Sequence, residues 1–126
     1  MRTFTTFEQL EEAVGEVLGP SGWLEMTQQR VDAFADATDD HQWIHVDVER
    51  ATAGPFGGTI AHGYLTLSLI PRFMPDLFSL KTPGPRLNYG VNKARFPNPV
   101  KVGARILSRA RHPGSRRIGY PAGSDE

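Results

Sequence analysis

Residues 60–73 carry large apolar side chains on nearly every side of a helix, namely Tyr64, Leu65, Leu67, Leu69, Ile70 and Phe73. A helix that is apolar all round has to be buried by the rest of the chain. Pro71 and Pro75 are expected to kink or end this helix. The sequence therefore predicts a central, buried helix around which the remaining elements must pack.

Shorter patterns on either side of this helix predict the other elements. A chain of 126 residues has room for one domain with one core. Thr5 with Glu8, or Thr6 with Gln9, can form a capping box for a first helix. The predicted elements are a helix over 6–18, a strand over 23–26, a helix over 27–38 capped by Thr27, and strands over 87–96 and 102–109.

Charge and composition argue against several classes of partner. Fourteen basic and fourteen acidic residues balance, which gives no reason to expect nucleic acid or a membrane surface as partner. No apolar run approaches the roughly 20 residues that span a bilayer, and the acidic N-terminal segment is not typical of a signal peptide. The lack of cysteine removes disulfides and thiol chemistry and fits a reducing compartment. We therefore expect a cytoplasmic protein.

Candidate catalytic residues gather between the second helix and the central one. Three aspartates within residues 36–40 crowd the C-terminal end of a predicted helix, where the helix dipole disfavours negative charge. Natural proteins tend to break such rules at functional sites. His45 follows Asp40 by five residues, and a His-Gly pair at residues 62–63 stands at the head of the central helix. The pattern predicts an acid/base pair that faces an oxyanion site.

Each of these residues also has a structural interpretation. Asp40 can be a turn residue bonded to its own backbone, His45 an interior histidine, and Gly63 a point of close packing. We expect His62 to fix its turn through a ring hydrogen bond. By residue type, a metal cluster has candidates in His41, His45, Asp47 and His62. No segment places two of them on one helical face, so no metal site is predicted.

Several motifs in combination resemble one known family. They are Asp40-x4-His45, Phe56-Gly57, Ile60-Ala61-His62-Gly63, Asn88-Tyr89-Gly90 and Arg95-Phe96-x2-Pro99-Val100-x2-Gly103. The chain resembles the MaoC-like dehydratases, or (R)-specific enoyl-CoA hydratases, over about residues 5–108. Its Asp-His-Gln-Trp-Ile-His sequence is most similar to that of the branch that includes the nodulation protein N-like hydratases of actinobacteria.

The resemblance implies an α+β hot-dog fold, in which an antiparallel sheet wraps a long central helix, with the active site at the interface of a homodimer. It implies that Asp40 and His45 position and deprotonate a water molecule. It also implies that the Gly63 backbone N–H binds the thioester carbonyl and that Ser68 is a supporting polar residue. The implied reaction is reversible hydration of trans-2-enoyl-CoA thioesters to (R)-3-hydroxyacyl-CoA, without a metal or an organic cofactor.

The C-terminal part departs from the family pattern. Family members continue after the strand over 102–109 with two long apolar strands, which lie between it and the strand over 87–96. Here residues 112–126 hold three glycines, two prolines and two large apolar residues, so we expect a disordered or atypical tail. The sequence thus predicts one incomplete domain over 1–111, with strand edges unpaired and one flank of the central helix uncovered.

Two other functions stay open. A thioesterase on the same scaffold would be distinguished by release of free thiol. A truncated, catalytically silent relative would bind acyl thioesters or a partner chain without turnover. The intact motifs favour the enzyme, and the C-terminal departure favours the silent protein.

Overall fold

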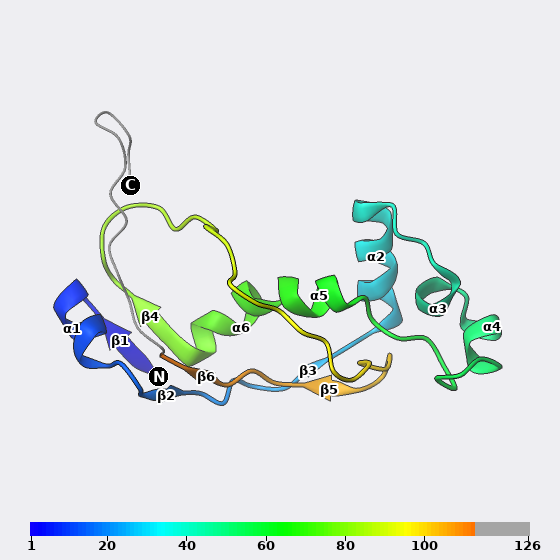
Figure 1. Cartoon of the computed structure of the whole chain (residues 1–126), viewed down its shortest axis with the longest axis horizontal. Helices are drawn as coiled ribbons and strands as arrows, with labels where there is room; N and C mark the ends of the chain where they lie inside the picture. Colours follow the sequence, from blue (N-terminus) through cyan, green and yellow to red (C-terminus); the bar gives the residue numbers. More distant parts are fainter. Residues whose placement is uncertain (113–126) are drawn as a thin grey trace.

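The computed structural model describes residues 1–112 as short strands and helices in an elongated arrangement (Figure 1). The elements are β1 (Arg2–Phe4), α1 (Phe7–Glu12), β2 (Val17–Leu18), β3 (Leu24–Glu25), α2 (Gln28–Thr38), α3 (Trp43–Val46), α4 (Val48–Thr52), α5 (Gly63–Ser68), α6 (Ile70–Leu77), β4 (Phe78–Leu80), β5 (Arg105–Ile106) and β6 (Ala110–Arg111). Strand β1 pairs with β4 in parallel, whereas β2–β6 and β3–β5 are antiparallel pairs.

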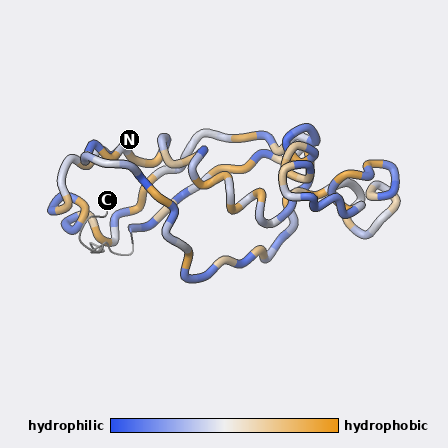
Figure 2. The backbone as a smooth tube through the Cα atoms, turned by 90° about the horizontal axis from the view of Figure 1, so that it is seen from above, coloured by the Kyte–Doolittle hydropathy of each residue, from blue (hydrophilic) through white to orange (hydrophobic). Residues whose placement is uncertain are grey.

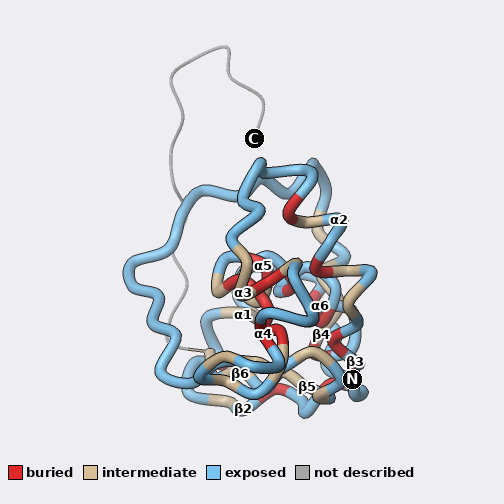
Figure 3. The backbone as a smooth tube through the Cα atoms, turned by 90° about the vertical axis from the view of Figure 1, so that its right-hand side faces the viewer, coloured by how far each residue is buried: buried red, intermediate tan, exposed pale blue. Residues whose placement is uncertain are grey.

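The core lies between the two central helices and a ribbon of strands. In Figure 1, α5 and α6 run along the antiparallel pairs β2–β6 and β3–β5, and α2, α3 and α4 form one end. Leu65, Leu69 and Phe73 are four residues apart, so they share one helix face. That face packs on Leu24, Met26, Val31 and Ala61. Figure 3 shows the buried positions around α5 and α6.

The central helix differs from the prediction at both ends and in its burial. Residues 60 and 61 are extended, and the helical segment is divided at Leu69 into α5 and α6, which continues past Pro75 to Leu77. The division has a covalent cause, because Pro71 has no N–H to donate four residues back. The flank carrying Tyr64 and Ile70 is exposed, by 70% and 43% respectively. The described chain therefore covers one face of the helix.

The first helix is shorter than the predicted range 6–18. Thr6 caps it, since its hydroxyl accepts from the Gln9 N–H, as in one of the two predicted boxes. The helix ends at Glu12, and Gly15 turns the chain with φ of +89°, a value that glycine adopts without steric cost. Residues 17 and 18 then pair with β6. The prediction of helix beyond residue 12 was wrong, because the local pattern carries no signal for the pairing of residues 17 and 18 with a strand distant in the sequence.

The predictions for residues 23–38 are confirmed, and that for 102–109 is confirmed in part. Strand β3 lies within the predicted range 23–26, and the Thr27 hydroxyl caps α2 by accepting from the Arg30 N–H. Of the last predicted strand, β5 forms a regular pair with β3. Gly103, at φ of +95°, bends the chain just before β5.

Residues 87–96, predicted as a strand, are irregular and exposed. They lie in the long arc of Figure 1 that connects β4 to β5. No backbone hydrogen bond joins residues 82–99 to another segment of the described chain. A strand requires a neighbouring strand for its N–H and C=O groups, and none lies beside this one within residues 1–112. Leu87, Tyr89 and Val91 are consequently exposed. Figure 2 shows hydrophobic positions along the whole tube rather than in one centre.

Two further sequence-based predictions concern the C-terminal tail and membrane-spanning segments. The tail predicted over 112–126 lies outside the described residues except for His112, and the boundary at residue 111 stays a prediction. Among the helices within residues 1–112, none is long and apolar enough to cross a membrane.

Candidate active site

Asp40 is placed by the C-terminal cap of α2. Asp39 adopts the left-handed conformation with φ of 57°, which aspartate tolerates better than most residues, and its N–H donates to the Ala35 carbonyl. The Asp40 N–H donates to the same carbonyl at 3.2 Å. The Asp40 backbone is thereby fixed just beyond the helix, while its side chain stays exposed.

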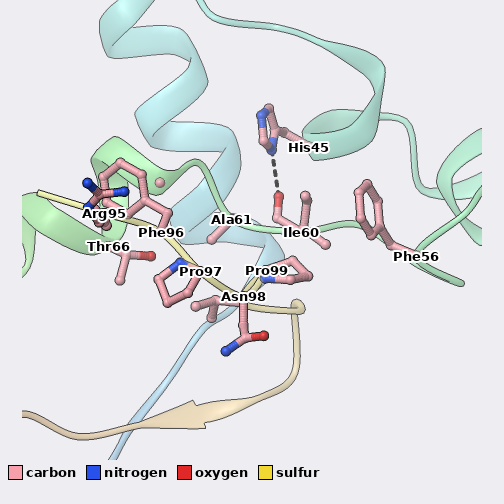
Figure 4. A pocket seen from close by; sticks show the side chains of 12 residues that line it. His45, Phe56, Ile60, Ala61, Thr66, Arg95, Phe96, Pro97, Asn98 and Pro99 are labelled. Atoms are coloured by element: carbon pink, nitrogen blue, oxygen red, sulfur yellow. Dashed lines mark hydrogen bonds between the residues drawn. The ribbon is translucent and has the colours of Figure 1, made fainter.

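His45 is buried on the single turn of α3, and its ring orientation is defined. Its Nδ1 lies 2.7 Å from the carbonyl oxygen of Ile60 (dashed in Figure 4). Because a carbonyl only accepts, Nδ1 carries the proton in the neutral ring and Nε2 keeps its lone pair. A neutral imidazole with a free Nε2 is able to accept a proton from water.

His62 joins the two predicted catalytic residues. Its Nε2 donates to the backbone carbonyl of Asp40 at 2.9 Å, so the predicted structural hydrogen bond of this ring is present. The ring also stacks on that of His45, with centroids 3.8 Å apart. Nδ1 of His62 is buried and has no hydrogen-bond partner among residues 1–112. His62 thus holds Asp40 and His45 next to each other.

The three side chains form a compact cluster. One carboxylate oxygen of Asp40 and one ring nitrogen each of His45 and His62 lie within 4.8 Å of one another. Two atoms at that separation can share one water molecule, since each hydrogen bond spans about 2.8 Å. Asp40 and His45 are therefore close enough to act on the same water.

The stacking of the two imidazoles argues against a shared metal ion. The His45 and His62 rings are inclined by 22°. The lone pairs of imidazole nitrogens lie in the ring planes, so in two stacked rings they lie in two nearly parallel planes. Ligands of one ion must instead point at a common centre at about 2.0 Å from each nitrogen. The cluster therefore suits proton transfer better than metal coordination.

A cavity of about 400 Å³ joins His45 to Gly63. Its wall is mainly apolar (Figure 4) and is formed by His45, Phe56, Ile60, Ala61, Gly63, Thr66, Arg95, Phe96, Pro97, Asn98, Pro99 and Val100. Gly63 is the first residue of α5, where backbone N–H groups have no partner within the helix. His45 and Gly63 thus line the same mostly apolar space.

The segment over 95–100 supplies one wall of this cavity, and its contact with Gly63 is close. A Cβ at residue 63 would lie 2.7 Å from Cδ2 of the Phe96 ring, which is shorter than a van der Waals contact. A side chain at residue 63 would therefore have to displace the Phe96 ring. Arg95 brings a cation to the same wall.

The structure does not bring every predicted residue to this site. The hydroxyl of Ser68 donates to the Tyr64 carbonyl at 2.6 Å on its own helix, and Ser68 is not among the residues that line the cavity. Asp47 caps α4 by accepting from the Arg50 N–H. The role predicted for Ser68 stays a prediction.

His41 is exposed beside the cluster and pairs with Asp36. Its Nε2 donates to the carboxylate of Asp36 at 2.8 Å. That hydrogen bond is the main cause that raises the pKa of His41 above 6.5, with smaller contributions from the charges of Asp36, Asp39 and Asp40. Since the pKa is higher in the folded chain, the pair stabilises the fold fully below about pH 6.5 and progressively less as the pH rises through the folded-state pKa.

We expect Asp36→Asn to lower the pKa of His41 toward its ordinary value, since the substitution removes the charged hydrogen-bond acceptor. An NMR titration of the His41 ring measures this change. Asp39→Asn serves as the comparison, because Asp39 acts on His41 only through its charge. An equal effect of both substitutions would contradict the assignment of the shift to the hydrogen bond.

The sequence patterns missed Gln28 and gave no role to Arg95 or Phe96. The Gln28 side chain donates to the backbone carbonyl of His45, a contact between residues 17 positions apart. A glutamine in the first turn of a helix carries no local signal for such a contact. Arg95 and Phe96 belong to a motif of the resemblance, but the motif alone does not say which cavity they line.

Comparison with known proteins shows the family of the chain. The MaoC-like domain family matches residues 9–121, which extends beyond residue 111. The chain is 51% identical over 119 residues to 3-hydroxyacyl-thioester dehydratase Z of Mycobacterium tuberculosis, covering 94% of this chain and 79% of that protein. It is 50% identical over 101 residues to nodulation protein N of Rhizobium leguminosarum bv. viciae, covering 76% and 61%.

A solved structure is similar in fold as well as in sequence. The unliganded R-hydratase PhaJ1 from Pseudomonas aeruginosa superposes with a TM-score of 0.60 at 27% identity, over 76% of this chain and 58% of that one. The chain has the helix-and-sheet architecture of the hot-dog fold, which its neighbours among the solved structures share. The chain belongs to the MaoC-like domain family, that of the MaoC-like dehydratases.

Proposed function

We propose that this protein adds water reversibly to trans-2-enoyl-CoA thioesters and gives (R)-3-hydroxyacyl-CoA. The observation that carries the proposal is the cavity lined by both His45 and Gly63, the first residue of α5, with a ring nitrogen of His45 within 4.8 Å of the Asp40 carboxylate. The names of the relatives support this reaction type, since dehydration of a 3-hydroxyacyl thioester is the reverse of the proposed hydration.

Each chemical task has a residue of the right type. Nε2 of His45, helped by Asp40, accepts a proton from water while the water oxygen bonds to C3 of the enoyl group. The C2–C3 π electrons then move toward the thioester, and the Gly63 N–H stabilises the charge that develops on the thioester oxygen. The proton returns to C2 through the Asp40–His45 pair, so atoms and charge balance.

We further propose that the reaction needs no metal ion or organic cofactor and takes place in the cytoplasm. The stacking of the two imidazoles supports the first point, because their lone pairs do not converge. The lack of cysteine fits a reducing compartment. Loss of activity after dialysis against a chelator, with recovery on adding a divalent metal, would contradict the metal-free mechanism.

A homodimer is part of the proposal. Its support is the exposed apolar flank of α5 and α6, with Tyr64 and Ile70, together with the unpaired segment at Leu87 and Tyr89. Large apolar side chains that the described chain leaves exposed favour association with a second copy that covers them. Light scattering coupled to size-exclusion chromatography is expected to give twice the mass of the 126-residue chain.

Crotonyl-CoA is the first substrate to test. We expect purified, folded protein to remove the ultraviolet absorbance of the enoyl thioester without releasing free thiol. Release of thiol would instead indicate a thioesterase. No turnover by a folded sample would indicate a catalytically silent relative.

A further inference from the structure

The side-chain amide of Gln28 connects three elements around the proposed base. Its Nε2 donates to the backbone carbonyl of His45 at 2.8 Å and to the carboxylate of Asp32 at 2.8 Å. Its Oε1 accepts from the hydroxyl of Thr59 at 2.6 Å. A flipped amide would turn its oxygen toward two acceptors, so these contacts fix one orientation of the group.

The contact with His45 satisfies a carbonyl that its own helix leaves free. Because α3 is a single turn, the carbonyls at its C-terminal end have few donors within the helix. His45 is buried, and an unsatisfied polar group at such a place costs about 1–3 kcal/mol. Gln28 supplies the donor and thereby fixes the backbone of His45.

The contact with Thr59 holds the segment that carries the hydrogen-bond acceptor of the same imidazole. Thr59 is buried and precedes Ile60, whose carbonyl accepts the proton of Nδ1 of His45. The Ile60 N–H donates in turn to the Ile44 carbonyl at 3.0 Å. One amide therefore fixes both the backbone that carries the ring and the segment that carries the ring's hydrogen-bond acceptor.

We propose that Gln28 and Thr59 are positioning residues that hold His45 in the orientation and Nδ1–H tautomer in which Nε2 can accept a proton; this role rests on the proposed hydratase function. This hydrogen-bond network joins Gln28 to the His45 backbone, the His45 ring to Ile60, and the neighbouring Thr59 back to Gln28. Without the Gln28 contacts, the ring and its acceptor are linked only by the Ile60 N–H to Ile44 carbonyl bond and by the Nδ1 bond itself. A displacement of about 1 Å in a catalytic group can reduce the rate about a hundredfold.

The kinetic test compares substitutions of similar shape. We expect Gln28→Met to lower kcat for crotonyl-CoA by about tenfold to a hundredfold and to change KM by less than about twofold, because substrate contacts are kept. Gln29→Met is the matched control, since Gln29 is exposed on the same helical turn. Thr59→Val is expected to reproduce the loss of kcat, and Thr59→Ser, which keeps the hydroxyl, to restore it.

A spectroscopic test reports on the tautomer without turnover. The ¹⁵N chemical shifts of the His45 ring distinguish a protonated Nδ1 from a protonated Nε2. We expect protonated Nδ1 in the wild-type chain and in Thr59→Ser, and a mixture of tautomers in Gln28→Met and Thr59→Val. This readout stays informative if crotonyl-CoA is not hydrated, so it separates the positioning role from the function.

Two results would overturn the proposal. One is an unchanged His45 tautomer in Gln28→Met together with unchanged kcat. The other is a loss of kcat that follows thermal stability alone, so that Thr59→Ser and Thr59→Val are equally impaired. A purely structural role lowers the melting temperature of the variants without changing the tautomer of the folded chain.

Discussion

Replacing His45 by glutamine is expected to reduce kcat for hydration of crotonyl-CoA by about a thousandfold, because positioned proton transfer contributes about 10²–10⁴ in rate. A glutamine side chain keeps a donor for the Ile60 carbonyl, which His45 Nδ1 contacts at 2.7 Å. It has no atom that takes up a proton near neutral pH. Steady-state kinetics, with circular dichroism to confirm the fold, measures the effect.

Asp40→Asn is expected to reduce kcat by a similar factor, since it removes the carboxylate and keeps the backbone contacts of Asp40 with Ala35 and His62. Asp39→Asn is the matched control, because asparagine tolerates the left-handed conformation of residue 39 equally well. If Asp39→Asn is as slow as Asp40→Asn, the effect comes from the charge of the whole turn. The assignment of Asp40 as a catalytic residue would then be wrong.

The sequence predicted those elements whose signals are local. Thr27 and Thr6 cap their helices through their own hydroxyls, three residues from the N–H they bind. Asp40 and His45 are five residues apart, and His45 lies on the single turn of α3, so a short stretch of sequence determines their proximity. Local hydrogen bonds depend on residues that lie within one helical turn of each other.

The features that the sequence could not predict depend on non-local pairing. Residues 17 and 18 continue a helical pattern, but they pair with a strand more than ninety positions away. Residues 87–96 have a strand-like pattern but no neighbouring strand in the described chain. Gln28 contacts His45 and Thr59 through tertiary structure alone. Tertiary contacts of this kind override local propensity.

Gly63 is the residue for which steric and catalytic explanations can be separated. Its N–H belongs to the backbone and is kept in every substitution except proline, so a side chain is used here as an obstruction. A Cβ on a helix tilts toward the N-terminus, which is the side from which a thioester oxygen would approach this N–H. The same Cβ would lie 2.7 Å from the Phe96 ring.

Gly63→Ala is expected to reduce kcat/KM by about a hundredfold, similar to the loss of one oxyanion donor. The fold should tolerate the change. Phe96 is 47% exposed on a segment without backbone hydrogen bonds to other described segments, so its ring can move. Alanine also favours a helix over glycine by up to about 1 kcal/mol. Thermal unfolding is therefore expected to change little while activity falls.

The double substitution Gly63→Ala/Phe96→Ala distinguishes obstruction of the oxyanion site from crowding against the ring. Removing the ring gives the new Cβ space, yet the Cβ still lies between the N–H and the thioester oxygen. We therefore expect the double variant to stay about a hundredfold slower than Phe96→Ala alone. Equal rates for the double variant and for Phe96→Ala would mean that Gly63 is needed for packing alone, and the N–H of α5 would have no part in binding the thioester.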